Sequence, residues 1–533
     1  MRQRLWRIIT VVFGPLCALL YPLLGTWSQN GAEVSGSDLL RPMLVILLFT
    51  LAFGGVLWLA TRRDTERTAT LATLVLLLFF SHDLVLFYVA PEVRDFLKTL
   101  LPYQTLIIEA PWVDISLWLV LALSLIGICS RIRDSIKLLT RLTFFSGILL
   151  GSLTPHLVPL VRSNNFSLPS ASTPAKVAPT RSYSSSPLPD LICIVLDGYG
   201  RQDVLQRLYG LDNTPFLQEL EKRGFYIARK SRANYIQTPL ALSSAFNLDY
   251  ILPPTKVYEH DTIFSQESLD KNRIRTLLKP KGFSFISVPT GVVQTQTPTA
   301  DLILEQVTLR GFRLTDMERM LLLRTPLGFL LRFERTAFDD HRSRLLSALD
   351  INLPAAVALP QPKFIFAHIL APHPPFVFGP KGEPRYPAGA SFTIGDATDY
   401  THRGSEKNYH QGYADQLVYL NQKVLESLDM IQKNTTRPTV IVLMGDHGPR
   451  MKTDWKSLAN TDVHEVFFNL MAVSTPDGKA EELLGESVSP INVFRLVLTR
   501  YFGQNLPRLP DQSYYSTLQR PYAFSDITPQ LGD

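Results

Sequence analysis

The first 161 residues are dominated by long apolar runs that are almost free of charged side chains. Three of these runs are 20 residues long and contain no Asp, Glu, Lys or Arg; another is interrupted only by His82-Asp83, and the last is shorter. A helix needs about 20 apolar residues to cross the hydrocarbon core of a bilayer. The pattern predicts five membrane-spanning helices, at Ile8–Trp27, Pro42–Thr61, Thr68–Ala90, Ile115–Ser130 and Leu142–Val161.

The basic residues between these runs predict an orientation. Ten Arg and Lys residues lie before the first run, after the second and after the fourth, whereas the opposite loops carry only Arg41, Arg94 and Lys98. Cytoplasmic loops of membrane proteins carry the excess of Lys and Arg. The N-terminus is therefore predicted to be cytoplasmic, and everything after Val161 extracytoplasmic.

The pair His82-Asp83 is unusual because it interrupts the third apolar run. Ionisable side chains are costly in hydrocarbon, and those that occur there are often functional. Two interpretations stay open, a functional site within the membrane and a buried pair that joins two helices.

Beyond the last apolar run the pattern changes twice. Residues 162–189 are rich in Ser, Pro, Thr and Ala, a composition that forms flexible tethers. From Asp190 onward, short β-branched runs alternate with amphipathic segments, which is typical of an α/β domain with a largely parallel sheet. The predicted organisation is a transmembrane domain at 1–161, a linker at 162–189 and an extracytoplasmic domain at 190–533.

Polar side chains follow three of the predicted strands. These strands are continuous apolar runs of the kind buried in parallel sheets, at Leu191–Leu196, Phe364–Ile369 and Thr439–Met444. Asp197 follows the first, His373 lies shortly after the second, and Asp446-His447 follows the third. Because ligands bind beyond the carboxyl ends of such strands, we expect these side chains on one rim. Asp197-Gly198 alone would also suit a turn, but Asp446-His447, flanked by glycines, favours a metal site.

Thr238, followed by Pro239, has the pattern of a helix N-terminus. A threonine there is often only a capping residue. A hydroxyl at that position also faces unpaired amides and the positive end of the helix dipole, which suits a phosphate and favours an alkoxide nucleophile. The pattern alone does not choose between a cap and a nucleophile.

Four segments together resemble a known family: IVLDGYGR, NYIQTPLALSSAFN, HILAPHPPF and IVLMGDHG, in that order behind the apolar runs. They are similar to the sulfatase-like branch of the alkaline phosphatase superfamily, near the lipoteichoic acid synthases and phosphoethanolamine transferases. The resemblance implies a five-helix anchor and an extracytoplasmic catalytic domain. It also implies that Asp197, Asp446 and His447 bind a metal, that Thr238 is both fourth ligand and covalent nucleophile, and that His373 lies near the phosphate or leaving group.

The cysteines separate this chain from two relatives. True sulfatases carry a Cys or Ser in a C/S-x-P-x-R sequence, whereas Cys193 is followed by Ile-Val-Leu within a predicted strand. Phosphoethanolamine transferases carry disulfides, yet Cys193 is the only one of the three cysteines that lies after residue 189. Neither sulfatase chemistry nor a disulfide framework is expected.

The charge distribution excludes a nucleic-acid partner. The formal net charge is +6, but residues 1–189 hold 16 basic and 10 acidic side chains, and residues 190–533 hold 37 of each. The excess therefore belongs to the membrane segments, where the loops explain it.

The predicted function is transfer of a phosphoryl head group from a membrane phospholipid to a cell-envelope glycan or lipid. The cofactor would be one divalent metal, Zn²⁺ or Mn²⁺ rather than Mg²⁺. Arg450 would either neutralise a phosphate oxygen or be a surface arginine. Two alternatives stay open: a phosphodiesterase or phosphatase that uses the same site, and a non-catalytic envelope protein with a degenerate site.

Overall fold

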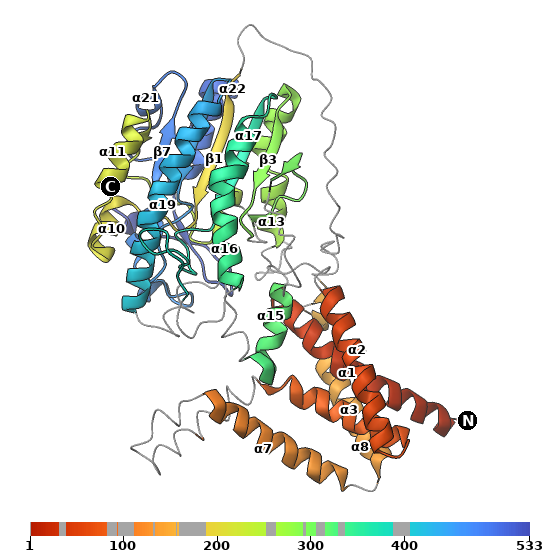
Figure 1. Ribbon diagram of the computed structural model, residues 1–533. Coiled ribbons are helices and arrows are strands. Elements are labelled where there is room, and N and C mark those ends of the chain that lie inside the picture. Colours follow the sequence, from red (N-terminus) through yellow and green to blue (C-terminus); the bar gives the residue numbers. More distant parts are fainter. Residues whose placement is uncertain are drawn as a thin grey trace, which may run out of the picture. The chain divides into compact units, whose positions relative to one another are not determined.

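The computed structural model describes residues 2–30, 39–82, 93, 111–131, 134–155, 157–158, 188–251, 263–291, 295–304, 315–328, 336–386 and 406–532. The chain divides into two compact units (Figure 1). The first comprises Met1–Ala171 and Arg310–Glu334, and the second comprises Ser172–Leu309 and Arg335–Asp533. The segment Arg310–Glu334 thus belongs with the N-terminal unit, although the sequence placed it within the domain 190–533. The predicted linker lies almost wholly outside the described residues.

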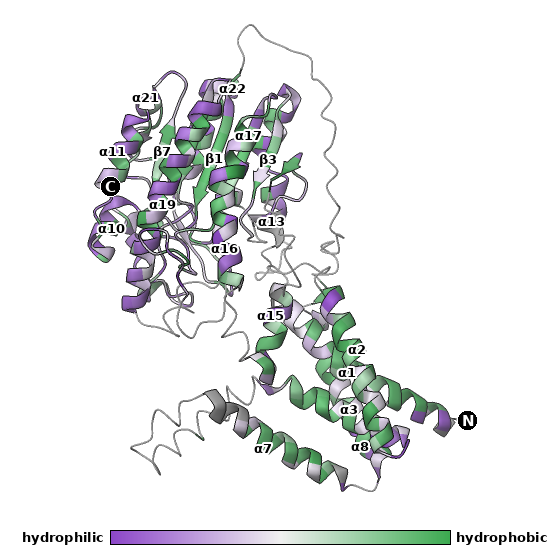
Figure 2. Ribbon diagram, viewed as in Figure 1, coloured by the Kyte–Doolittle hydropathy of each residue, from purple (hydrophilic) through white to green (hydrophobic). Residues whose placement is uncertain are grey.

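The first unit is built from apolar helices (Figure 2). Helices α1, α3 and α8 pack against one another, with α2 and α7 against α3 and α15 against α1. Their contact buries Leu23, Trp27, Ala72 and Leu139, whereas many apolar side chains of α2 stay exposed. The helices are α1 (Arg2–Asn30), α2 (Leu40–Ala60), α3 (Thr65–Phe79), α7 (Pro111–Ser130), α8 (Ser135–Ser152) and α15 (Asp316–Leu323).

Two helices of the described residues are long and apolar enough to cross a membrane, Arg4–Ser28 and Leu40–Ala60, and Ser116–Cys129 is a shorter apolar helix. Each of the five predicted runs overlaps a helix, but the count of five spans stays a prediction. His82 is buried beside Trp118, with ring centroids 5.9 Å apart, while Asp83 lies outside the described residues.

All five of the helices that overlap the predicted runs begin before them, and an aspartate cap accounts for the start in two cases. Helix α3 begins at Thr65 because the Asp64 carboxylate accepts a hydrogen bond from the Arg67 amide, 3.0 Å away. Helix α8 begins at Ser135, where Asp134 accepts from the Lys137 amide at 3.3 Å. An aspartate at the N-cap satisfies an amide that the helix leaves unpaired, so hydrophobicity alone misplaces these starts.

The second unit is an α/β domain around a seven-stranded sheet (Figure 1). The strand order is β2-β7-β6-β1-β5-β3-β4, in which β6, β1, β5, β3 and β4 run parallel and β7 runs antiparallel to β6 and β2. The predicted, largely parallel α/β sheet is confirmed. The strands are β1 (Asp190–Leu196), β2 (Tyr226–Ile227), β3 (Ser284–Val288), β4 (Leu302–Ile303), β5 (Lys363–Ile369), β6 (Thr439–Met444) and β7 (Met471–Ser474), with a separate pair β8 (Tyr514–Tyr515) and β9 (Ser525–Asp526).

Helices cover both faces of this sheet. Side chains of a strand alternate between faces, and those of β1 divide accordingly: Ile192 and Ile194 enter one core, Cys193 and Val195 the other. The first core is closed by α10 (Gln202–Tyr209), α11 (Thr214–Lys222), α16 (Thr336–Ser347), α17 (Leu353–Val357) and α19 (Glu406–Asn434). The second is closed by α12 (Thr238–Asn247), α14 (Arg273–Leu278), α21 (Ala480–Leu484) and α22 (Pro490–Phe502), with α13 (Ile263–Asp270) beside α12; α20 (Val463–Phe467) follows β6. Burial on both faces explains why β1, β5 and β6 read as continuous apolar runs.

Candidate metal and phosphoryl-transfer site

The carboxyl ends of β1 and β6 bring the predicted site residues together. The two strands are parallel neighbours, with Val195 opposite Met444, so Asp197 and Asp446 leave the sheet at the same edge. Two glycines permit the turns that follow. Gly198 has a φ of +73°, and a Cβ on Gly448 would lie 2.0 Å from the Glu465 carbonyl oxygen, so no larger residue fits there.

Four buried side chains meet beyond these strand ends. The Nε2 atom of His447 lies 3.1 Å from Thr238 Oγ1, 3.2 Å from Asp446 Oδ2 and 3.4 Å from Asp197 Oδ1. Within the described ranges, the two aspartates and His447 are the one cluster of three acidic or imidazole groups compact enough for a metal, with ligand atoms within 4.8 Å of one another. The Gly198 amide donates to Asp446 Oδ1 at 3.1 Å and fixes that carboxylate.

The tautomer of His447 makes this cluster suited to a cation. Its Nδ1 lies 2.7 Å from the Gly448 carbonyl oxygen, so Nδ1 carries the proton and donates it, and Nε2 presents a lone pair to the two carboxylates. Asp197 Oδ1 and Asp446 Oδ2 are buried and accept no hydrogen bond. Three buried lone pairs that face one point are costly unless a cation lies between them. The residues therefore fit a divalent metal.

The electrostatics of the cluster agree with this geometry. Burial, together with the positive charge of Arg450, lowers the pKa of His447 to about 3, so the imidazole is neutral and free to act as a ligand. Burial and the negative charge of Asp197 raise the pKa of Asp446. Burial alone would also raise the pKa of Asp197, but the electrostatic influence of His373 and the hydrogen bond with His368 outweigh it and hold that pKa below its usual value.

Thr238 is the first residue of α12 and does not act as its cap. The N-cap position belongs to Gln237, whose side chain makes no capping bond, and the Thr238 hydroxyl lies against His447 instead. The structure thus contradicts the plain capping interpretation. Thr238 is only 6% exposed, and its hydroxyl lies at the positive end of the ten-residue helix.

Arg450 lies inside the site. Its Nη2 donates to Thr238 Oγ1 at 3.3 Å and to the Ile236 carbonyl oxygen, and its guanidinium lies over the Trp455 ring, 5.1 Å from the centroid. The residue is only 8% exposed. The alternative of a surface arginine is therefore wrong, because stacking and hydrogen bonds hold the charge beside the hydroxyl.

His373 is joined to the cluster through the backbone. Its amide donates to the Asp197 carbonyl oxygen at 3.0 Å, and its Nδ1 lies 2.6 Å from the Pro374 carbonyl oxygen. That contact assigns the Nδ1 proton and leaves Nε2 to hold or release a proton. The backbone bond to Asp197 thus brings His373 next to the cluster.

The sequence offered His368 only as one of several possible ligands of a second metal and did not include it in the predicted site. Its Nε2 lies 3.1 Å from Asp197 Oδ2, and its Nδ1 lies 2.9 Å from Thr295 Oγ1. It is paired across the sheet with Val195 and fully buried. The available signal was its polarity within the apolar run of β5, where a buried imidazole requires partners.

The family comparison matches part of this unit. Residues 341–498 match the family model described as Sulfatase. The chain carries a sulfatase-like domain. This confirms the resemblance to the sulfatase-like branch of the alkaline phosphatase superfamily and the expectation of an enzyme of that superfamily. The matched residues include His368, His373, Asp446 and His447, whereas Asp197 and Thr238 lie before them.

Solved structures similar to the chain include transferases and a hydrolase. The integral membrane protein lipooligosaccharide phosphoethanolamine transferase A from Neisseria meningitidis is 12% identical, with a TM-score of 0.39, and the match covers 93% of this chain and 94% of that one. The C-terminal periplasmic domain of EcEptC from Escherichia coli, in complex with Zn, is 13% identical with a TM-score of 0.38, covering 64% and 92%. The phosphonate monoester hydrolase of Agrobacterium radiobacter is 13% identical with a TM-score of 0.38, covering 61% and 80%. No curated protein matches the chain.

Proposed function

We propose that the protein is a membrane-anchored, metal-dependent transferase. It moves a phosphoryl head group from a membrane phospholipid to a hydroxyl on a cell-envelope glycan or lipid, through a phospho-threonine intermediate. The observation that carries this proposal is the Thr238 hydroxyl, which lies at the N-terminus of α12 and 3.1 Å from His447 Nε2. A hydroxyl in that position serves neither the helix cap nor the apolar core.

The metal would be held by Asp197, Asp446, His447 and Thr238, an arrangement of three oxygens and one imidazole nitrogen. Such a set suits Zn²⁺ or Mn²⁺ better than Mg²⁺. A divalent cation in this place would lower the pKa of the Thr238 hydroxyl and shield negative charge on a phosphate oxygen.

The side chains of the site carry out the remaining steps of the reaction. Thr238 Oγ1 attacks phosphorus, and the bond from phosphorus to the diacylglycerol oxygen breaks. Arg450, which already donates to Thr238 Oγ1, attracts the phosphate oxygens and orients them. His373 holds a proton at Nε2 and delivers it to the leaving oxygen. In the second step an acceptor hydroxyl gives its proton to His373 Nε2 and its oxygen bonds to phosphorus, while the bond from phosphorus to Thr238 Oγ1 breaks and Thr238 leaves as the alkoxide that attacks in the first step.

The membrane helices would keep the reaction close to the membrane. The domain order 1–161, 162–189 and 190–533 would hold the catalytic domain outside the cytoplasm and near lipid head groups. The donor would then be presented at the surface of the membrane that anchors the enzyme. A nucleic acid has no place in this scheme.

The experiment that tests the proposal is intact-mass analysis of the purified full-length chain after incubation with mixed phospholipids and Zn²⁺ or Mn²⁺. We expect an adduct that maps to Thr238, and its mass identifies the head group. The Thr238→Ala variant is the control and should carry no adduct. An unmodified wild-type chain under these conditions, or an adduct that persists in the variant, contradicts the proposed intermediate.

Transfer and hydrolysis share the first step, so the acceptor separates them. A phospholipid with a labelled head group is supplied to the enzyme with and without a glycan extract. Label recovered on the glycan fraction supports transfer. Free head group as the sole product in both reactions contradicts transfer and favours the hydrolase.

A further inference from the structure

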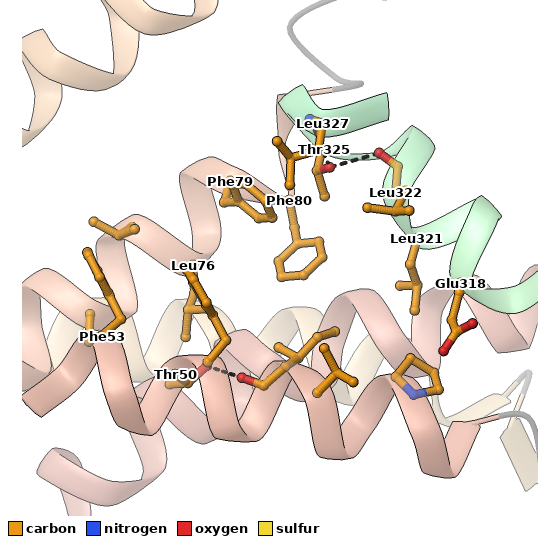
Figure 3. Close-up of a pocket in the computed structure, with 16 residues that line it drawn as sticks. Thr50, Phe53, Leu76, Phe79, Phe80, Glu318, Leu321, Leu322, Thr325 and Leu327 are labelled. Atoms are coloured by element: carbon orange, nitrogen blue, oxygen red, sulfur yellow. Dashed lines mark hydrogen bonds between the residues drawn. The ribbon is translucent and has the colours of Figure 1, made fainter. Parts of the chain in front are cut away.

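An apolar pocket of about 410 Å³ lies within the first unit, between α2, α3 and α15 (Figure 3). Leu76 of α3 and Leu321 of α15 point into it and are 6% and 4% exposed. Val45 and Phe49 of α2 form the open side, where they are 50% and 60% exposed. The pocket thus has a buried inner wall and an open outer wall on a helix long enough to cross a membrane.

The polar groups of the wall are already satisfied. Thr50 Oγ1 donates to the Ile46 carbonyl oxygen at 2.7 Å, and Thr325 Oγ1 donates to the Leu322 carbonyl oxygen at 2.8 Å. Both hydroxyls bond their own backbone, so they leave an apolar interior. Such a lining suits hydrocarbon rather than a polar solute.

One end of the pocket is charged. Glu318, which lines the wall, pairs with Arg41 through two hydrogen bonds, one of them 2.6 Å from Nε to Oε1. Thr315 and Glu318 form a capping box at the start of α15. The ion pair therefore fixes α15 to the N-terminal end of α2 and places a polar boundary at that end alone.

The length of the pocket agrees with half a bilayer. Its lining on α2 runs from Pro42 to Phe53, which at 1.5 Å per residue is about 16 Å. One leaflet of the hydrocarbon core is about 15 Å thick. The predicted orientation puts Arg41 at the extracytoplasmic end of α2. Helix α15 has eight residues, too few to cross the membrane, and the second unit precedes and follows it in the sequence, so α15 is expected on the extracytoplasmic side as well.

We propose that this pocket holds one acyl chain of a phospholipid of the outer leaflet, with its head group at the Arg41–Glu318 end. The apolar lining, the single charged end and the one-leaflet length all match an acyl chain that enters from the bilayer. That this lipid is the donor rests on the proposed function, whereas the binding itself does not.

The test uses the full-length chain in vesicles that contain a phospholipid with a photoreactive diazirine within its acyl chain. Surrounding lipid labels every exposed apolar residue, so the diagnostic adducts are those on the buried Leu76 and Leu321. Val45→Trp fills the pocket, and Val56→Trp is a matched control on the same helix at an exposed position that does not line it. An acyl chain in the pocket gains only van der Waals packing over an acyl chain in the surrounding lipid, so its preference for the pocket is modest. We therefore expect Val45→Trp to lower labelling of Leu76 and Leu321 by about threefold or more.

The control Val56→Trp should label like wild type, and both variants should keep the wild-type thermal unfolding midpoint. Label confined to exposed residues, equal labelling in the two variants, or cross-links to a second copy of the chain would each overturn the proposal. Thr238→Ala is expected to label normally, so a failure of the phospho-threonine mechanism leaves this result intact.

Discussion

His368 shows how one buried bond can control a metal site. Its imidazole is hydrogen-bonded to Asp197 Oδ2, the carboxylate oxygen that does not face His447. Loss of a hydrogen bond to a metal ligand typically lowers metal affinity by about 10–100-fold. We expect His368→Phe to weaken metal binding by about that factor, because the apolar ring keeps the volume but not the bond. Chelator-competition titration measures the affinity. His368→Gln, which can restore the donor, should recover most of the affinity. His464→Phe, at a histidine whose ring lies tilted against that of Phe468, should leave the affinity unchanged. Equal losses in all three variants would contradict a positioning role.

When the metal is removed, the carboxylate of Asp446 should destabilise the fold. Its Oδ2 then faces the His447 lone pair and the Asp197 carboxylate without a hydrogen bond. In Asp446→Asn the amide can donate to His447 Nε2, while Oδ1 keeps the bond from Gly198. After chelation we expect the variant to unfold about 2 °C or more above the wild type, since it loses repulsion worth on the order of 1 kcal/mol. The same variant should bind less metal by elemental analysis; a chelated variant that unfolds earlier than the wild type would argue against carboxylate repulsion.

Single residues also show where sequence reasoning succeeds. Asp197, Asp446 and His447 could be placed on one rim because each follows an apolar strand, and parallel strands end together. His368 could not be found in this way, since it lies within a strand and its partner is set by sheet order. The burial of Arg450 likewise depends on the Trp455 ring, five residues further along the chain.

At the scale of elements, the short helix α20 supports the loop that carries His447. The Gly448 amide donates to the Val466 carbonyl oxygen at 2.7 Å. Within α20, Glu465 is buried and accepts from the Tyr209 hydroxyl at 2.8 Å and from the Lys452 amide at 2.6 Å. The buried carboxyl group of Glu465 thus lies in the helix that hydrogen-bonds to the loop after His447.

The titration of Glu465 should make this part of the fold sensitive to pH. Burial raises its pKa from 4.5 to about 7, so its favourable contribution is complete below pH 4.5 and is lost as pH rises through about 7. Across that window the free energy of unfolding should fall by about 3 kcal/mol. Glu465→Gln should flatten the dependence of the thermal unfolding midpoint on pH, whereas Glu482→Gln, on the exposed side of α21, should leave it unchanged. A variant with the wild-type slope would contradict this role.

Elements whose partners lie far away in sequence resist prediction. Helix α15 has only eight residues, too short a segment for its apolar pattern to reveal that it packs against α1. Its place follows from the ion pair between Arg41 and Glu318, 277 residues apart. By contrast, β1, β5 and β6 were predictable because their apolar runs need no knowledge of a partner.

At the scale of the whole molecule, the number of spans determines which side each part occupies. Two helices meet the length and hydropathy needed to cross a membrane, and two spans would put the N-terminus and the second unit on the same side. Five spans would put them on opposite sides. With either number of spans the ten basic residues share one face, which the charge rule places in the cytoplasm, so the two topologies differ in the side of the second unit.

Cysteine accessibility in intact cells separates these two topologies. Arg62→Cys, just after α2, and Asp477→Cys, in an exposed turn of the second unit, are treated with a thiol reagent that cannot cross the membrane. With five spans we expect Asp477→Cys to label and Arg62→Cys to label only after the cells are opened, while the parent chain, whose Cys17 and Cys193 are buried, gives the background. Two spans with a cytoplasmic N-terminus would put both positions inside, so labelling of both only after the cells are opened would contradict five spans.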